Sequence, residues 1–450
     1  MTPRSIVLAA AGLTLVLPPT LTAAQSPVSP RATTGDPTVD SAAAARAHWS
    51  SANAALAAND TAAAYRHATR AAVAWPTQPT YLWGRAVTAA LAADTTGTRD
   101  ALAAYAAIGM GRDLRADAGF RAIVADPRSS ALLEQLDANR RPVTNSRVAF
   151  ELSDSTFWPE GIDHDPRTGR FYVTSVRHRT IVERSPDGAE RELIPRQTPG
   201  IGAILAVRVD TARNVLWATS SGLPQMAGYA PSDSSHGVIL RIGLRDGVVE
   251  RWNMPGGGKH MLGDIAVVPN GDVYVTSSSQ PILYRFKSGD GTLERITSPL
   301  FRSLQGIATG VRSSYPGHLL YVADYSHGLL VLDPASGVIV RVRDAPQSTS
   351  LGIDGLVADG DALIAVQTGV APARVMRFQL HSTGTAIASA ELLDRNSTIA
   401  DEPTAGVVVG RRLFYVGNSQ WEKYDDAGRR RANVSLRRPV ILELPLEIQR

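Results

Sequence analysis

The chain has 450 residues, of which 44% are hydrophobic, and its formal net charge at pH 7 is +4. This length suits two domains, and the apolar content is enough for packed cores, which excludes a wholly disordered chain. The charge is too small for the basic stripe that nucleic acid requires, and the absence of cysteine excludes disulfides, thiolate metal sites and cysteine nucleophiles.

Residues 1–24 have the order of a signal peptide. Arg4 supplies the positive start, an apolar run follows over residues 6–17, and small residues come next. The run is short for a bilayer span, although an uncleaved N-terminal anchor is an alternative. We expect cleavage after Ala24, no membrane span in the mature chain, and a periplasmic or secreted protein. Residues 25–40 are rich in Pro, Ser and Thr and predict a flexible linker.

Residues 41–141 are rich in alanine, and their apolar residues recur at helical spacing. Two shorter helices are expected at the end of this region, the last beginning at Pro127. The paired helices with small residues at their crossings resemble tetratricopeptide repeats. The region carries no cluster of titratable side chains, so we expect it to dock a protein partner or to support the structure. The four longer helices are predicted over residues 41–60, 61–75, 79–94 and 98–110.

Residues 146–450 change to short β-branched and aromatic runs between Gly, Pro, Asp and Asn turns. Six phrases in this region share one design, an apolar strand, a turn and a second strand ending in Thr, Ser or Asp. Their starts lie roughly 40 to 60 residues apart, the spacing of propeller blades. The sequence therefore predicts a mainly β protein, a six-bladed β-propeller with a small N-terminal all-α domain. The phrases span residues 159–175, 202–221, 263–278, 305–324, 354–368 and 402–419.

The sixth phrase lacks an outermost strand at the C-terminus. Only one further strand, over residues 439–447, follows it. Residues 147–152, just before the first blade, can supply the missing strand. Pairing the two ends of the β region in one blade would close the ring and leave no open edge between the first and last blades.

The inner strands of a propeller line its channel, and their first residues face one mouth. Four of the six opening positions are carboxylates and one is a carboxamide. Such a group is electrostatically costly without a cation, and hard oxygen ligands suit Ca²⁺, or another hard divalent cation. The alternative is that the acids accept hydrogen bonds from backbone amides and stabilise blade corners. The opening positions are Glu160, Ala203 or Ile204, Asp264, Gln305, Asp354 and Glu402.

The six-phrase region resembles the senescence-marker, gluconolactonase and luciferin-regenerating family of six-bladed propellers. Pro-Glu-Gly at Glu160 is similar to the first metal-binding glutamate of that family, and Ile-Asp-Gly at Asp354 is similar to its aspartate-glycine phrase. The resemblance implies that Glu160, Gln305 and Asp354 hold the metal. Two positions depart from the pattern, because Gln305 and Gly263 each replace an expected asparagine. Glutamine keeps a carbonyl ligand but is one methylene longer, so the ion would be held in altered geometry.

The activity implied by the resemblance is hydrolysis of a lactone or small ester, with a metal polarising the carbonyl and a carboxylate activating water. Asp354 would be the base. His260, which lies four residues before Asp264 in a Gly-rich loop over residues 254–260, is a second candidate for the base that its position suggests. Asp264 and Glu402 would bind the small-molecule substrate or tune the metal. Two alternatives remain open at this point. One is a non-catalytic binding module for a small molecule or protein, and the other is a purely structural propeller.

Overall fold

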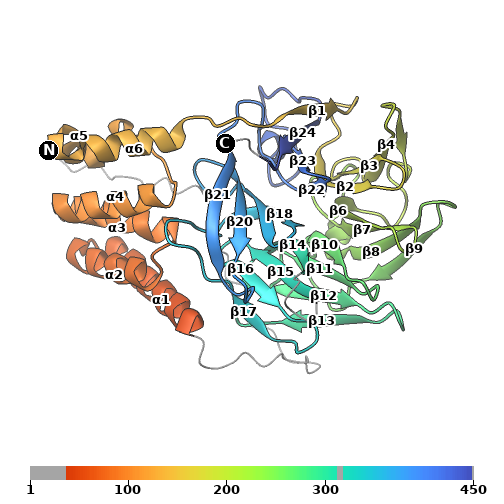
Figure 1. Ribbon diagram of the computed structural model, residues 1–450, viewed down its shortest axis with the longest axis horizontal. Coiled ribbons are helices and arrows are strands. Elements are labelled where there is room, and N and C mark those ends of the chain that lie inside the picture. The colour runs from red at the N-terminus through yellow and green to blue at the C-terminus, as the bar shows by residue number, and fades with distance from the viewer. Residues whose placement is uncertain (1–36, 312–317, 448–450) are drawn as a thin grey trace.

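The computed structural model describes residues 37–311 and 318–447. It confirms the predicted fold class, a six-bladed β-propeller preceded by a helical region. Figure 1 shows the helices stacked on one side of the propeller, with the chain passing from the last helix to β1 (Arg147–Glu151), which pairs with β24 (Val440–Pro445). The predicted signal peptide lies outside the described residues, as does most of the predicted linker. The first helix begins at Pro37, within the last residues of that linker.

The helical region begins with two antiparallel helix pairs, which match the positions predicted from the alanine-rich pattern. Asp60 and Asp94 cap their helices by accepting hydrogen bonds from the backbone N–H of Ala63 and Gly97. Short 3₁₀ turns follow at η1 (Leu114–Ala116), η2 (Ala118–Phe120) and η3 (Pro127–Ser129). The α-helices are α1 (Pro37–Ala57), α2 (Thr61–Ala74), α3 (Pro79–Leu91), α4 (Thr95–Ala107), α5 (Arg121–Ala125) and α6 (Ser130–Arg140).

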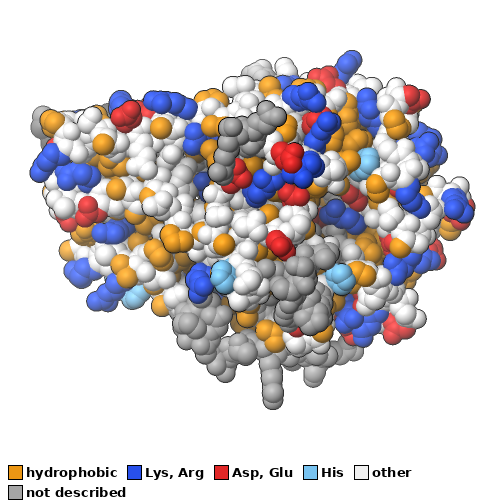
Figure 2. Space-filling view, in the orientation of Figure 1, with side chains coloured by type: hydrophobic (Ala, Val, Ile, Leu, Met, Phe, Trp, Pro, Cys, Tyr) orange, Lys and Arg blue, Asp and Glu red, His pale blue; other side chains and the backbone are white. Residues whose placement is uncertain are grey.

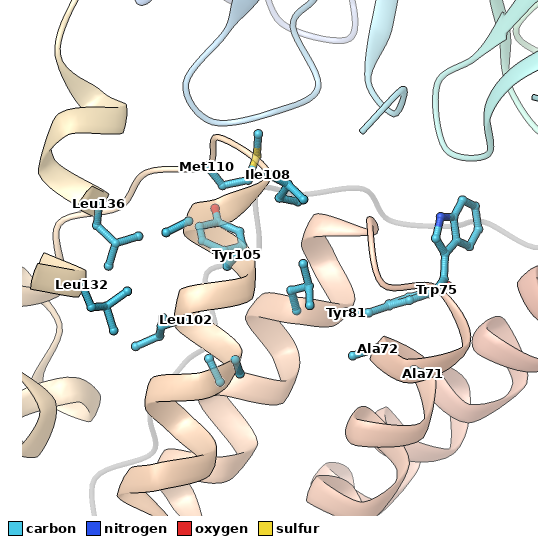
Figure 3. Packing of buried hydrophobic residues seen from close by; sticks show 14 of the residues in the cluster. Ala71, Ala72, Trp75, Tyr81, Leu102, Tyr105, Ile108, Met110, Leu132 and Leu136 are labelled. Atoms are coloured by element: carbon cyan, nitrogen blue, oxygen red, sulfur yellow. The ribbon is translucent and has the colours of Figure 1, made fainter. Parts of the chain in front are cut away.

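The core of the helical region contains both alanines and large side chains. Ala71 and Ala72 on α2 let the helices approach closely, while Tyr81, Leu102 and Tyr105 fill the space between them (Figure 3). The same cluster includes Leu351, which belongs to the propeller. The helical region and the propeller therefore share one buried core.

Six four-stranded antiparallel sheets form the blades. Blade 1 contains β2 (Pro159–Asp165), β3 (Arg170–Ser175), β4 (Thr180–Arg184) and β5 (Glu190–Glu192). Blade 2 contains β6 (Ala203–Asp210), β7 (Val215–Ser221), β8 (Gly237–Gly243) and β9 (Val249–Asn253). Blade 3 contains β10 (Leu262–Val267), β11 (Val273–Ser277), β12 (Ile282–Phe286) and β13 (Leu293–Thr297).

Blade 4 contains β14 (Leu304–Val311), β15 (His318–Asp324), β16 (Gly328–Leu332) and β17 (Ile339–Arg341). Blade 5 contains β18 (Ile353–Asp359), β19 (Ala362–Gln367), β20 (Arg374–Leu380) and β21 (Ile387–Arg395). Blade 6 contains β22 (Gly406–Val409), β23 (Arg412–Val416), β24 (Val440–Pro445) and β1. Two further 3₁₀ turns, η4 (Pro231–Ser235) and η5 (Trp421–Lys423), lie in connections of blades 2 and 6.

The predicted closure of the ring is confirmed. β1 pairs antiparallel with β24, so the outermost strand of blade 6 comes from the N-terminal side of the propeller. The inner strands β2, β6, β10, β14, β18 and β22 each contact the next around the ring. Six buried hydrophobic clusters each join two neighbouring blades, which fills the space between every adjacent pair of sheets. This packing stabilises the ring without disulfides.

Three helices point their C-terminal ends at blades 4 and 5, and an arginine of the propeller meets each one. The Arg341 guanidinium lies 4.2 Å from the ring centre of Trp75, which caps α2. Arg374 donates to the carbonyl oxygen of Ile108 at the end of α4. Arg395 donates to that of Ala138 near the end of α6. Cations at helix C-termini are favoured by the helix dipole, so these contacts stabilise the junction.

Charged side chains of both signs are interspersed over the face shown in Figure 2. Within residues 37–311 and 318–447, no helix has both the length and the apolar character needed to cross a membrane.

Candidate functional site

The inner strands of blades 1 to 5 are irregular near their first residues. Their register with the second strand shifts between Pro159 and Ile162 in blade 1 and at the equivalent point in the next four blades. A β-bulge bends the strand and changes the direction of a side chain. Each bulge contributes a residue to one cavity at the mouth of the channel, and these residues are Glu160, Leu205, Asp264, Gln305 and Asp354.

Threonines on the second strands hold the bulges in place. Thr174 accepts the backbone N–H of Gly161 and donates to the carbonyl oxygen of Leu205 in the next blade. Thr276 makes the same two contacts with Asp264 and Gln305, at 2.9 and 2.6 Å. Thr219 repeats the pattern between blades 2 and 3. Each threonine thus satisfies the backbone groups that a bulge leaves unpaired and joins adjacent blades at the mouth.

The cavity has a volume of about 30 Å³. A space of this size holds an ion or about two water molecules. Blade 2 contributes Leu205 instead of Ala203 or Ile204, because the bulge moves the facing position along the strand. Blade 6 contributes Thr404 and Ala405 to the lining.

Glu160 has no cationic partner among the described residues. Its Oε2 accepts a hydrogen bond of 2.8 Å from the indole N–H of Trp421. Burial raises the pKa of Glu160 well above its usual range, and the nearby charges of Asp354 and Glu402 raise it further, against the Trp421 hydrogen bond. The ionised form of this carboxyl group is therefore poorly compensated by the protein itself.

Asp354 reaches the same cavity from blade 5. Burial raises the pKa of Asp354 to about 6, the charge of Asp264 adds to the effect, and a hydrogen bond from the hydroxyl of Thr368 opposes it. At neutral pH this carboxyl group is largely ionised but is basic for an aspartate. It is therefore able to accept a proton from water.

Glu402 is near the site but does not line the cavity. It lies before β22 with a φ of 60°, in the left-handed region. Its Oε1 accepts the backbone N–H of Glu422 at 2.9 Å, while its Oε2 is buried with no hydrogen-bond partner in the structure. Burial raises the pKa of Glu402 to about 7. An unpaired buried oxygen of this kind is costly, and a ligand or a proton would satisfy it.

Asp264 lines the cavity, but its carboxylate is already occupied. One oxygen accepts the backbone N–H of Ile307 at 3.0 Å and the other accepts that of Ile265 at 2.8 Å. The half-buried Arg208 guanidinium lies 3.7 Å from Asp264 and 3.6 Å from Asp163. These contacts hold β10 against β14, the corner-stabilising role that the sequence left open for such acids.

Gln305 and Gly263 lie beside each other at the cavity. A Cβ atom on Gly263 would stand 3.5 Å from Oε1 of Gln305. The missing side chain at position 263 therefore leaves space for the longer glutamine. The two departures from the family pattern are complementary in space.

His260 is buried away from the cavity. Its side chain is 2% exposed and lies against Gly237 and the hydroxyl of Tyr284, which is 3.4 Å from its Nδ1. Burial lowers the pKa of His260. It is not among the residues that line the cavity.

Trp421 is a site residue that the periodicity of the blades does not reveal. It lies on η5, in the long connection between β23 and β24, and its ring makes an edge contact with Trp158 at 4.9 Å. An apolar cluster surrounds these rings and includes Leu205, with Met261 packed against it, and both of these residues also line the cavity. Arg208, in the middle of the inner strand β6, is a further residue near the site that the repeat pattern does not indicate. The length of the blade 6 connection is the signal that could have drawn attention to Trp421.

Among the described residues, no three His, Asp and Glu side chains stand close enough to form a metal site from these ligands alone.

The sequence matches no family model and no curated protein. Similar solved structures include a gluconolactonase from Xanthomonas campestris, with 16% identity over 69% of this chain and 92% of that chain and a TM-score of 0.45. A calcium-binding regucalcin from Agrobacterium tumefaciens has 14% identity over 66% and 93% of the two chains and a TM-score of 0.43. A virginiamycin B lyase from Staphylococcus aureus has 17% identity over 68% and 89% and a TM-score of 0.45.

Gluconolactonase-like and regucalcin propellers are thus among its structural neighbours. Identities and TM-scores this low assign neither a family nor an activity to this chain.

Proposed function

We propose that this protein is a cation-dependent hydrolase of a lactone or small ester, with the cation held at the channel mouth. The observation that carries the proposal is the meeting of Glu160 and Asp354 in one small cavity with no cationic side chain paired to either. Two carboxylates that share a small, half-buried cavity repel each other unless a cation or protons compensate them. A divalent cation would do so and would fit the volume of the cavity.

The donor chemistry of the cavity fits a hard cation such as Ca²⁺. Glu160 and Asp354 would contribute carboxylate oxygens, and Gln305 its amide carbonyl, because Gly263 leaves room for that side chain. Water and backbone carbonyls would complete the six to eight oxygens that Ca²⁺ usually takes. Asp264 is left out of the ligand set, because its oxygens already accept hydrogen bonds from the backbone.

In this proposal each protein group has a separate role. A bound cation would polarise the carbonyl group of the substrate. Asp354, whose pKa lies near 6, would accept a proton from the attacking water. Trp421 would orient Glu160 through its indole N–H, and Glu402 would contact substrate above the cavity with its unpaired oxygen. His260 has no role in this arrangement, since it is buried elsewhere.

A non-catalytic binding module is the second candidate, and the size of the cavity favours it. A volume of about 30 Å³ admits an ion but no lactone ring, so a substrate would have to bind above the lining residues. A propeller that binds a cation and a small molecule or protein without chemistry would have the same cavity.

Calorimetric titration with Ca²⁺, followed by hydrolysis of a panel of lactones, tests both candidates. The hydrolase predicts binding of one ion and turnover, both lost in Asp354→Asn and Glu160→Gln. Asp359→Asn is a matched control, because Asp359 lies at the other end of β18 and pairs with Arg377. Ion binding without turnover on any lactone would favour the binding module, and no ion binding would exclude both cation-dependent candidates.

We also propose that the chain is exported, on the basis of its N-terminal sequence. Cell fractionation with N-terminal sequencing of the mature protein tests this, and a start at Gln25 is the expected result.

A further inference from the structure

Arg374 is a buried cation without a carboxylate partner. It is 5% exposed, and no acid of the described residues lies within salt-bridge distance of it. Its Nε donates to Oε1 of Gln367 at 2.7 Å, and its Nη1 donates to the carbonyl oxygen of Ile108 at 3.0 Å. Ile108 caps the C-terminus of α4, where the helix dipole favours a positive charge. Arg374 thus joins the helical region to Gln367.

Gln367 in turn holds the segment that leads to Asp354. Its side chain is fully buried, and its amide nitrogen donates to the carbonyl oxygens of Thr349 and Leu351 at 2.9 and 2.7 Å. Its backbone pairs with Ile353, the first residue of β18. Gln367 therefore fixes the backbone that leads to Asp354, through both its side chain and its main chain.

The loop that follows α4 also packs closely against the propeller at Arg374. Gly109 has a φ of +81°, and a Cβ atom there would stand 2.5 Å from Nη1 of Arg374. The backbone N–H of Gly111 donates to the carbonyl oxygen of Ala371 at 3.1 Å. Figure 3 shows Ile108 and Met110 at the end of the helical region that faces the propeller loops. The loop after α4 thus fits directly over Arg374.

We propose that Arg374 is a positioning residue of the candidate site. The C-terminus of α4 binds Arg374, Arg374 binds Gln367, and Gln367 fixes the backbone of Asp354 at the channel mouth. The helical region therefore helps to hold the site in place. The assignment of a role for Asp354 in cation binding rests on the proposed function, whereas the connection itself rests on the hydrogen bonds above.

Arg395 provides a matched control for Arg374. The two residues are opposite each other in the pairing of β20 with β21. Arg395 also donates to carbonyl oxygens at the end of a helix, those of Ala138 on α6 and of Arg141, which caps α6. It makes no contact with Gln367 in the structure. Arg374→Met and Arg395→Met therefore each remove a contact between the two domains, but only the first breaks the connection to Asp354.

The experiment compares the full chain and these two variants by amide hydrogen exchange of residues 349–356 and by calorimetric titration with Ca²⁺. We expect Arg374→Met to speed exchange in this segment and to weaken Ca²⁺ binding by about tenfold or more, as loss of a group that orients a ligand does. Arg395→Met should lower the melting temperature but leave both readouts unchanged. Gln367→Glu should reproduce the exchange and affinity changes, since it keeps the acceptor for Arg374 but loses the donated hydrogen bonds.

Equal effects of Arg374→Met and Arg395→Met on exchange would overturn the inference, because Arg374 would then only dock the domains. Unchanged exchange in Arg374→Met would also overturn it, even if the wild-type chain binds Ca²⁺. If the wild-type chain binds no Ca²⁺, but Arg374→Met still speeds exchange in residues 349–356 and Arg395→Met does not, the positioning role is supported and the proposed function is contradicted.

Discussion

The side chain of Gln305 occupies space that Gly263 leaves open, with its Oε1 atom 3.5 Å from the place of a Cβ atom on that glycine. The two residues belong to the inner strands of neighbouring blades. Gly263 does not adopt a left-handed φ, so a side chain is compatible with its backbone. The size of the side chain at position 263 is therefore limited by the space in the cavity and not by the backbone conformation.

Gly263→Asn is expected to displace Gln305 and weaken Ca²⁺ binding by about tenfold. Gly263→Ala should weaken Ca²⁺ binding much less than Gly263→Asn does. Its Cβ would meet Oε1 of Gln305 at 3.5 Å, an ordinary van der Waals contact, and the hydroxyl oxygen of Thr276 at 3.2 Å, which needs a shift of only a few tenths of an ångström. Calorimetric titration of both variants checks this. An asparagine variant with wild-type affinity would mean that Gln305 is not a ligand.

Cation binding should change the tryptophan fluorescence through Trp421. Its indole N–H donates to Glu160, so a charge arriving at that carboxylate alters the surroundings of the ring. Trp421→Phe is expected to abolish the change and Trp252→Phe to keep it, since Trp252 packs in the cluster between blades 2 and 3. A fluorescence change that survives in Trp421→Phe would place the cation elsewhere.

Thr276→Val should destabilise the protein by about 1–3 kcal/mol, the cost of leaving buried backbone groups unpaired. The hydroxyl of Thr276 accepts the N–H of Asp264 and donates to the carbonyl oxygen of Gln305. Thr276→Ser keeps the hydroxyl and should lose much less stability. Urea unfolding of the two variants measures the difference, and equal stabilities would argue against a bridging role for the threonine hydroxyl.

We expect the buried His327 to lower the free energy of unfolding of the protein in acid. It is 1% exposed, stacked edge-on against Trp75, and its Nδ1 is 3.0 Å from Arg46. Burial, followed by the charges of Arg341, Arg46 and Arg302, lowers the pKa of His327 to about 2. Asp324, also buried, is the nearby acid, and it accepts the backbone N–H of His327.

Because the folded-state pKa of His327 is below the unfolded value of about 6.5, the unfolded chain binds the extra proton. Stability is therefore complete above about pH 6.5 and declines as the pH falls toward 2. By pH 4.5 the loss from this group reaches about 3 kcal/mol at most, at about 1.4 kcal/mol per pH unit. In urea unfolding at pH 7 and 4.5, His327→Gln should lose less stability between the two conditions. An equal loss would show that His327 is not the group responsible.

Much of the architecture was predictable because each blade repeats a local pattern. The alternation of apolar residues and turns located the inner strands, and the lone strand after the sixth phrase predicted that β1 would pair with β24. The convergence of Glu160, Gln305 and Asp354 on one cavity followed from their equivalent places in the repeat.

The features of the site that the sequence did not predict depend on contacts between segments that are distant in the chain. In blade 2, a β-bulge makes Leu205 the residue that faces the cavity. The position where the strand begins in the sequence does not reveal this shift. Trp421 reaches Glu160 from an irregular connection, and the Asp264 carboxylate is taken by the backbone of another blade. The contact of α4 with Arg374 joins two regions with different periodicity, so neither pattern indicates it.

The most direct test of the account is a crystal structure of the protein grown with Ca²⁺. We predict one ion at the channel mouth, with oxygen atoms of Glu160, Gln305 and Asp354 at about 2.3–2.6 Å from it. A cavity filled only by water at saturating Ca²⁺, or an ion bound without these three residues, would contradict it.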